Sequence, residues 1–112
     1  MKSASAELPG TDRLLRAVAD EQRRAVLRTL DAADDTLDYE TLTERVVDRI
    51  RTGDEDLPRT EHRGQVRIAL YHTHLPKLAE SGLVVTDSDR KLVRSATDDE
   101  IRALLDCVES LE

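Results

Sequence analysis

The chain has few of the residues from which most active sites and disulfide scaffolds are built. Its 112 residues include one cysteine, Cys107, four glycines and two aromatic residues, Tyr39 and Tyr71. A single cysteine excludes a disulfide within the chain and is typical of a reducing compartment such as the cytoplasm. With so few aromatic side chains, a substrate pocket or a base-stacking platform has little to be built from.

Catalytic and membrane signatures are missing as well. The chain has no glycine-rich phosphate loop and no nucleophile elbow, and Cys107 has no histidine near it in sequence. No apolar run approaches the roughly 18 to 20 residues of a membrane span, and the N-terminus has no signal-peptide core. We therefore expect one soluble, cytoplasmic domain that is not an enzyme, uses no cofactor and meets no membrane.

The three histidines do not form a recognisable metal site. His72 and His74 are two residues apart, so on a helix they point in different directions and cannot chelate one ion, unlike a pair at i and i+4. His62 is distant in sequence, and there is no second cysteine. We expect no bound metal, and the sequence identifies no small-molecule effector.

Residues 66–85 are the most informative stretch. Apolar residues at helical spacing predict one buried helix face: Ile68, Tyr71, Leu75, Leu78 and Ala79. Gly82 suits the positive φ with which many helices end. Residues 83–85 and 92–93 then predict two short strands, joined by the turn-forming residues 86–90. A long helix that runs directly into a β-hairpin indicates a winged helix.

Three further helices are predicted upstream. Each has an apolar stripe, which comprises Leu14, Leu15 and Val18 in the first, Val26, Leu27 and Leu30 in the second, and Tyr39, Leu42, Val46 and Ile50 in the third. The first begins near Asp12, and Asp20 and Asp38 are placed to cap the other two. A polar loop is expected at 31–35, and residues 52–58 separate the third helix from the long one.

Two features of the long helix leave alternatives open. Val66 and Leu70 fall outside the predicted stripe, so either the loop around Leu57 or a partner protein covers them. Pro76 removes one backbone hydrogen bond and tends to kink a helix. The kink either aims the first half of the helix into a DNA groove or has no functional role.

The last predicted element is a helix that begins at a capping box, Thr97–Asp–Asp–Glu100. It carries an apolar stripe of Ile101, Leu104, Leu105, Val108 and Leu111. This stripe either packs on its own domain or pairs with the same helix of a second chain. Cys107 flanks the stripe and is expected to be half-buried, or to form a redox-sensitive contact across a dimer.

Together these patterns predict an α+β, mostly helical protein. We expect a winged helix-turn-helix with a two-stranded β-hairpin wing and a C-terminal helix. Residues 1–10 are expected to form a flexible tail, residues 11–96 the winged helix-turn-helix domain, and residues 97–112 the C-terminal helix used for packing or dimerisation.

Particular residues also resemble a known group of proteins. His74–Leu75, Leu78 and residues 79–84 resemble the recognition helix and wing entry of ArsR-like winged-helix regulators, and residues 14–27 are similar to their opening helices. Residues 69–78, ALYHTHLPKL, more closely resemble a family of small winged-helix proteins of haloarchaea. The interval 52–58 departs from the ArsR pattern, in which the turn is shorter.

The resemblance implies sequence-specific binding of double-stranded DNA by a transcription regulator. Regulators of this kind commonly dimerise through terminal helices, so it also implies a homodimer whose interface contains the stripe of the last helix. His72 and Thr73 are the expected base contacts. The expected phosphate contacts are basic residues of the long helix and hairpin, namely Arg63, Arg67, Lys77, Arg90 and Lys91. These basic residues could instead pair with neighbouring carboxylates.

The charge of the chain does not exclude a DNA partner. Asp and Glu total 24 against 17 Lys and Arg, which gives −7 overall. Residues 59–94, however, carry seven basic and four acidic residues, a local charge of +3. Three lysines and a dispersed acidic surface, taken with the resemblance, indicate a halophilic protein. In molar salt the screening length is roughly 3 Å, so an acidic body repels DNA weakly.

A second function stays open, because winged-helix domains also serve as protein-interaction modules without binding DNA. In that alternative, Val66 and Leu70 would form an exposed apolar patch on the long helix. The sequence does not choose between the two functions.

Overall fold

The computed structural model describes residues 12–34, 36–50 and 59–111. Residues 12–18 are helical. The elements that follow are α2 (Glu21–Ala33), β1 (Leu37–Asp38), α3 (Tyr39–Ile50), α4 (Arg59–Ala69), a π-helical turn η1 (Leu70–His74), α5 (Leu75–Glu80), β2 (Val84–Asp87), β3 (Leu92–Ser95) and α6 (Asp99–Ser110). The protein is therefore α+β and mostly helical, as predicted. The predicted tail 1–10 and loop 52–58 lie outside the described residues.

The sheet has three antiparallel strands in the order β1-β3-β2. β2 and β3 form the predicted hairpin, with Val84 paired to Ser95 and Asp87 to Leu92. The two-stranded hairpin is present, and a third strand that was not predicted extends it, because Leu37 pairs with Val93 on the other edge of β3. A two-residue strand has no period to detect in the sequence, and it forms here only because the hairpin offers it a free edge.

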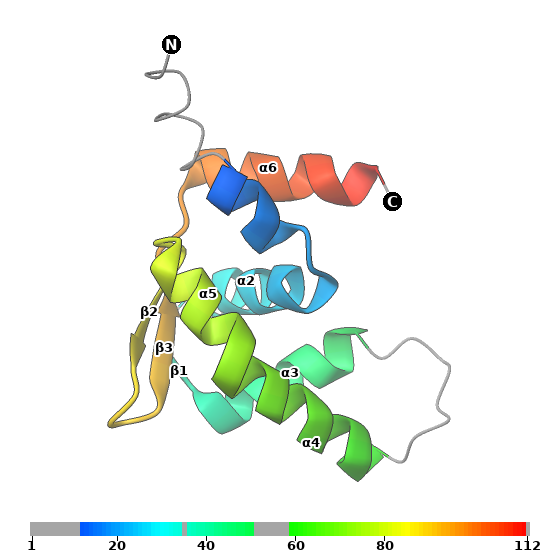
Figure 1. The fold of residues 1–112 in the computed structure, drawn as a ribbon, viewed down its shortest axis with the longest axis vertical. Helices are drawn as coiled ribbons and strands as arrows, with labels where there is room; N and C mark the ends of the chain where they lie inside the picture. The colour runs from blue at the N-terminus through cyan, green and yellow to red at the C-terminus, as the bar shows by residue number, and fades with distance from the viewer. Residues whose placement is uncertain (1–11, 35, 51–58, 112) are drawn as a thin grey trace.

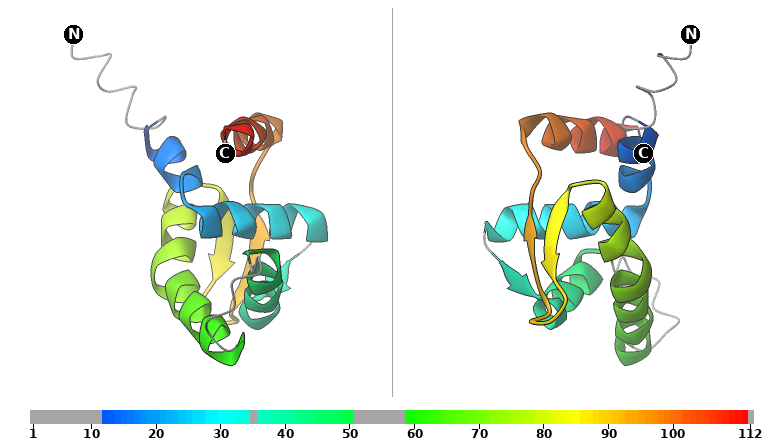
Figure 2. Two further views of the ribbon diagram at one scale, coloured as in Figure 1. Left: turned by 90° about the vertical axis from the view of Figure 1, so that its right-hand side faces the viewer. Right: turned by 60° about the vertical axis from the view of Figure 1, so that its left-hand side comes forward.

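The core lies between α2, α3, the α4–α5 helix and the sheet. Its fully buried large side chains come from every layer, namely Val18, Val26, Leu27, Leu30, Leu42, Val46, Val47, Val66, Leu70, Leu78, Val93 and Leu105. Each such side chain stabilises the fold by roughly 1.5 to 3 kcal/mol through burial. Helix α6 lies across α2 on the far side from the hairpin loop, as Figures 1 and 2 show.

Several predicted helix ends are confirmed. The carboxylate of Asp20 accepts hydrogen bonds from the backbone amides of Gln22 at 2.7 Å and Arg23 at 3.1 Å, so Asp20 is the N-cap of α2. Gly82 has a φ of +77°. The amide of Leu83 donates to the carbonyl of Leu78 at 2.9 Å, and that of Gly82 to Ala79 at 3.0 Å. This is the Schellman arrangement, which turns the chain from α5 into β2.

Two other predicted boundaries were wrong. Residues 31–33 belong to α2 and not to a loop, and α6 is capped by Asp98 and not by Thr97. The hydroxyls of Thr97 and Ser95 both donate to Oδ1 of Asp31, at 2.9 and 3.0 Å. Thr97 is therefore used in a tertiary contact, and Asp98 accepts from the amide of Ile101 instead.

The predicted buried face of the long helix was wrong in its first half. Ile68 is 62% exposed, whereas Val66 and Leu70 are buried in the chain's own core. The cause is η1, in which the amide of Leu75 donates to the carbonyl of Leu70, five residues earlier. A π turn holds more residues than an α turn. Extrapolation back from Leu75 at 3.6 residues per turn reaches Ile68, but the wider turn moves the buried stripe to Leu70 and Val66.

The first helix also differs from its prediction in one position. Val18 is fully buried and Leu14 partly buried, as expected, but Leu15 is 46% exposed. Ala17 is buried and takes its place in the core. Positions i, i+3 and i+4 share one helix face, and Leu15 is turned about 100° away from Leu14.

Candidate nucleic-acid interface

Helices α4 and α5 and the turn η1 form one continuous rod, which leads into the hairpin (Figure 1). The side of the rod opposite the core is exposed over its whole length. Its exposed side chains are Glu61, Gln65, Ile68, His72, Thr73, Pro76, Lys77 and Glu80. They recur at steps of three and four residues, so they follow one stripe along the rod. The predicted base contacts His72 and Thr73 lie at the middle of this stripe.

The π turn places those two residues. His72 and Thr73 lie inside η1, and Pro76 follows in the first turn of α5. Proline has no amide hydrogen for the helical ladder, and a π turn is one way in which a helix accommodates that loss without breaking. The rod therefore continues through Pro76, and its exposed stripe carries polar side chains on both sides of the turn.

Two of the predicted phosphate contacts are engaged by carboxylates of α3. Nη2 of Arg63 lies 2.6 Å from Oε1 of Glu40, and its Nε donates to Glu44. Nε of Arg67 lies 2.9 Å from Oε2 of Glu40, which also accepts the hydroxyl of Tyr71 at 3.0 Å. That hydroxyl, together with the two arginines, lowers the pKa of Glu40. Because these groups face solvent, their charges are screened and the ion pairs contribute little to the stability of the fold.

The other predicted phosphate contacts lie on α5 and in the hairpin loop. Lys77 is exposed near the end of α5, and Arg90 and Lys91 are exposed between β2 and β3. Lys91 adopts a positive φ of 58°. Asp87 accepts from the amide of Arg90 at 3.2 Å, which orders this loop. Nε of Arg90 lies 3.9 Å from Asp87, an exposed and weak pairing.

His74 is buried behind the exposed stripe and hydrogen-bonded on both ring nitrogens. Nδ1 lies 3.1 Å from Nη1 of Arg23, and Nε2 lies 3.1 Å from Oε1 of Gln22. The pKa of His74 is lowered, chiefly by burial, while Asp20 acts in the opposite direction. His74 therefore has a packing and hydrogen-bonding role. It joins the rod to the first turn of α2.

The stripe predicted for a dimer interface packs mainly on the chain's own core. Leu105 is fully buried, and three further members, Ile101, Leu104 and Val108, are partly buried against the core. Leu111 is 82% exposed. Helix α6 is also held by ion pairs, because Nη2 of Arg28 lies 2.5 Å from Asp106 and 2.8 Å from Glu109. Cys107 is an exposed free thiol and not half-buried, because it lies on the side of α6 away from Leu105.

Other kinds of site find little support in the part of the chain that the structure describes. Residues 12–34, 36–50 and 59–111 contain no group of three or more His, Cys, Asp and Glu side chains placed to hold a metal ion. Within the same ranges, no helix is long and apolar enough to cross a membrane.

Sequence reasoning missed two members of the exposed stripe. Gln65 was given no role, and Ile68 was assigned to the core. The available signal was the spacing of Gln65, Ile68, His72 and Thr73, which share one face once the phase of the buried residues is known. Gln can pair with adenine through two hydrogen bonds, and an apolar side chain can contact a thymine methyl.

Comparison with known proteins gives a family without a known function. No curated protein matches the chain. No solved structure matches it. The model of the family described as Domain of unknown function (DUF7344) matches residues 15–94, from the first helix to β3. Since this match covers most of the chain, the protein belongs to that family.

Proposed function

We propose that the protein is a winged-helix regulator that binds double-stranded DNA with the exposed stripe of the α4–α5 rod. The order of elements supports a winged helix: helices, the short strand β1, α3, the α4–α5 rod and then the β2–β3 hairpin. The strand order β1-β3-β2 supports it too, because the hairpin is extended at its β3 edge by the strand that precedes α3. In this arrangement the rod is the recognition helix and the hairpin is the wing.

The observation that carries the proposal is the exposed stripe itself. Gln65, His72 and Thr73 are side chains able to exchange hydrogen bonds with base edges, and the opposite face of the rod is fully occupied by core contacts. Polar side chains on an outward face need no function. Here, however, they follow one stripe on the element that adjoins the hairpin. In the proposal His72 and Thr73 read bases, with Gln65 as an additional contact.

The phosphate contacts divide into two kinds. Lys77, Arg90 and Lys91 are exposed and can reach a backbone phosphate directly. Arg67 must exchange Glu40 for a phosphate, and Arg63 must exchange Glu40 and Glu44. Since the pairs are partly exposed, this exchange costs little, and a phosphate offers the same fork-like geometry to a guanidinium.

The homodimer remains part of the proposal. Leu105 is buried by its own chain, so the contact between two chains would use the outer edge of α6, where Leu111 and Cys107 are exposed. Sedimentation equilibrium of the wild type and of Leu111→Asp tests this part. If the wild type is a monomer, the homodimer part of the proposal is contradicted. DNA binding is then still tested separately.

The test of DNA binding is enrichment of genomic fragments by the purified protein in molar KCl, which suppresses non-specific phosphate binding. His72→Ala/Thr73→Ala removes the proposed base contacts. Glu21→Gln/Arg45→Gln changes two exposed side chains of α2 and α3 without changing the net charge and is the matched control. Circular dichroism establishes first that all three proteins are folded.

We expect the wild type and the control to recover one shared sequence and the stripe variant to lose it. No enrichment by a folded wild type would contradict the proposal and favour the protein-interaction module. For that alternative, the expected apolar patch is not exposed, because Val66 and Leu70 are 1% and 0% exposed.

A further inference from the structure

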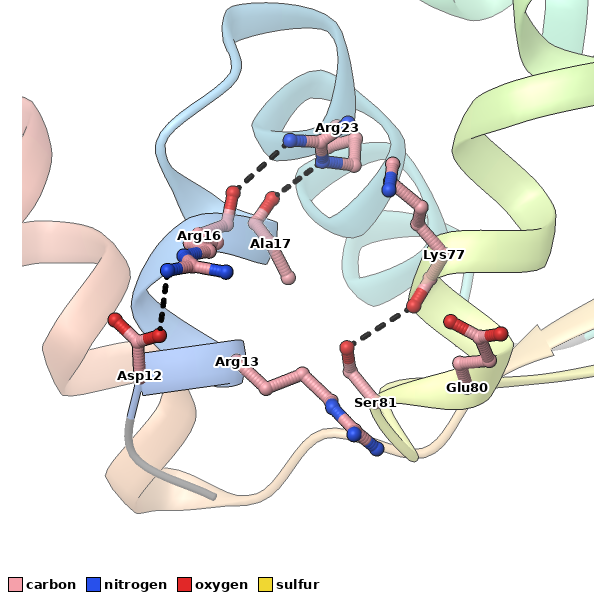
Figure 3. Close-up of a pocket in the computed structure, with 8 residues that line it drawn as sticks. All are labelled: Asp12, Arg13, Arg16, Ala17, Arg23, Lys77, Glu80 and Ser81. Carbon is pink, nitrogen blue, oxygen red and sulfur yellow. Dashed lines mark hydrogen bonds and ion pairs between the residues drawn. The ribbon is translucent and has the colours of Figure 1, made fainter. Parts of the chain in front are cut away.

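A pocket of about 450 Å³ lies between the first helix and the end of α5 (Figure 3). It is lined by Asp12, Arg13, Arg16, Ala17, Arg23, Lys77, Glu80 and Ser81. Its size is within the range of about 300 to 1,000 Å³ found for small-molecule sites. Four of the lining residues are basic, in a chain whose formal charge is −7.

Three hydrogen bonds fix Arg23 at this pocket, and no carboxylate among the described residues pairs with it. Its Nε donates to the carbonyl of Ala17 at 2.8 Å, Nη2 donates to the carbonyl of Arg16 at 2.9 Å, and Nη1 lies 3.1 Å from Nδ1 of His74. A guanidinium has five N–H donors, so two remain for a ligand. The side chain has already lost its rotational freedom, which reduces the entropy that binding must cost.

Arg13 and Lys77 add two more positive charges. Within the described ranges, neither side chain has a carboxylate within 4.0 Å, whereas Arg16 pairs with Asp12 at 2.9 Å. Figure 3 shows Arg13, Arg23 and Lys77 around the hollow on different sides. Glu80 is the one lining carboxylate outside the Arg16–Asp12 pair. Three unneutralised cations against one anion leave the pocket with an excess positive charge of about two.

We propose that this pocket binds the phosphate group of a small phosphorylated ligand. Arg23 is the fixed anchor, and Arg13 and Lys77 contact the same phosphate from the two facing helices. Guanidinium groups hold phosphate through paired, charge-assisted hydrogen bonds, and a lysine adds a mobile point charge. The hydroxyl of Ser81 already donates to the carbonyl of Lys77 at 3.0 Å, so it is not needed as a ligand.

A DNA phosphate is the other source of the same chemistry. The pocket lies where α5 ends and the chain enters β2, and Figure 1 shows the hairpin loop at the opposite end of the β2 and β3 strands. The site is also concave, with walls from two helices, whereas contacts that track a DNA backbone are made by an open surface. These features favour a small ligand. The inference does not depend on the proposed DNA binding.

His74 supplies a reporter inside the protein. Its pKa is lowered chiefly by burial, and the positive charges of Arg23 and Lys77 contribute in the same direction. A bound phosphate would offset those two charges. The pKa of His74 is therefore expected to rise when the pocket fills, and the ring carbon resonances of His74 report that pKa by NMR.

The experiment is an NMR titration of the full chain with inorganic phosphate, against chloride at matched ionic strength. We expect saturable shifts of the Arg23 Nε–H signal and a rise in the pKa of His74. Arg13→Gln/Lys77→Gln should weaken binding by about ten-fold or more, since charge-assisted hydrogen bonds are lost. Arg45→Gln/Arg94→Gln removes the same charge from exposed positions on α3 and β3 and should leave binding unchanged.

Three outcomes would overturn the proposal. The first is no saturation with phosphate by the folded protein, and the second is equal weakening by both double variants. The third uses a short DNA duplex without free phosphate. If the duplex shifts the Arg23 signal, and Arg13→Gln weakens binding of the duplex as much as it weakens binding of phosphate, the pocket is part of a DNA-binding surface. If the duplex leaves the Arg23 signal unchanged, the small-ligand site is supported, whether or not the protein binds DNA elsewhere.

Discussion

The guanidinium of Arg23 determines which nitrogen of His74 carries the proton. Nη1 of Arg23 lies 3.1 Å from Nδ1 of His74, and an arginine can only donate. Nδ1 must therefore be unprotonated, and Nε2 donates to Oε1 of Gln22 at 3.1 Å. The neutral Nε2–H tautomer is the form that satisfies both contacts. Protonation of Nδ1 would place two donors against each other.

The stability of the protein is expected to fall when the pH is lowered through the titration of His74. The folded-state pKa of His74 lies below its ordinary value of 6.5. Between those two pKa values, the unfolded chain binds a proton that the folded chain does not, so the free energy of unfolding decreases as the pH decreases. Urea unfolding at several pH values between about 7.5 and 5 measures this slope.

His74→Gln is the variant for that measurement, because an amide can still accept from Arg23 and donate to Gln22. This variant should reduce the slope of the free energy of unfolding against pH over the range in which His74 titrates. His72→Gln is the matched control, since His72 is exposed, and it should keep the wild-type slope. Equal slopes in the wild type and both variants would show that carboxylates alone determine the acid sensitivity.

Glu40→Gln is expected to strengthen DNA binding. Glu40 holds both Arg63, at 2.6 Å, and Arg67, at 2.9 Å. Neutralising it releases the guanidinium of Arg67 for a phosphate, weakens the hold on Arg63, whose Nε still donates to Glu44, and removes one negative charge. The affinity for DNA measured by fluorescence anisotropy should rise several-fold. The slope of log affinity against log salt concentration should steepen by the amount expected for about one additional phosphate contact. Glu100→Gln, which removes an exposed charge from α6, should leave both quantities unchanged.

Unfolding measurements can test which face of the α4–α5 rod is buried. Leu70→Ala should lower the free energy of unfolding by about 2 to 5 kcal/mol, because Leu70 is fully buried. Ile68→Ala should change it by less than about 0.5 kcal/mol, because Ile68 is 62% exposed. Chemical unfolding of both variants measures the difference. A larger effect at Ile68 would mean that the helix continues without the π turn.

A similar pair of variants tests how α6 is attached to the core. Leu105→Ala should destabilise the protein by about 2 to 5 kcal/mol, because its side chain fills the core beneath α6. Leu111→Ala should have almost no effect in dilute solution, since Leu111 is 82% exposed. If Leu111→Ala destabilises the protein only at high protein concentration, Leu111 contributes to a contact between two chains.

Some features could be read from short stretches of sequence. Asp20 caps α2 because its carboxylate reaches amides two and three residues ahead, and Gly82 ends α5 because only glycine adopts positive φ without cost. The hairpin follows from the alternation of branched residues and turn formers within residues 83–93. These contacts span a few residues, so their signals remain local.

The candidate site could be predicted only in part. His72 and Thr73 do lie on an exposed face, as their positions off the apolar stripe indicated. Gln65 and Ile68 were missed because the π turn changes the helical phase by about one residue, and no period in the sequence shows it. The pairing of Arg63 with Glu40 and Glu44 brings together residues about 20 positions apart, which charge patterning alone did not resolve.

The sequence by itself determined the local elements of this protein: its helices and hairpin, the caps at Asp20 and Gly82, and the apolar residues available for a core. Only the tertiary structure decided which of those residues are buried, which arginines are neutralised, and that Arg13, Arg23 and Lys77 share one pocket. The physical reason is range. Caps and turns depend on neighbours a few residues apart, whereas burial and charge pairing depend on how distant helices pack, which no local pattern specifies.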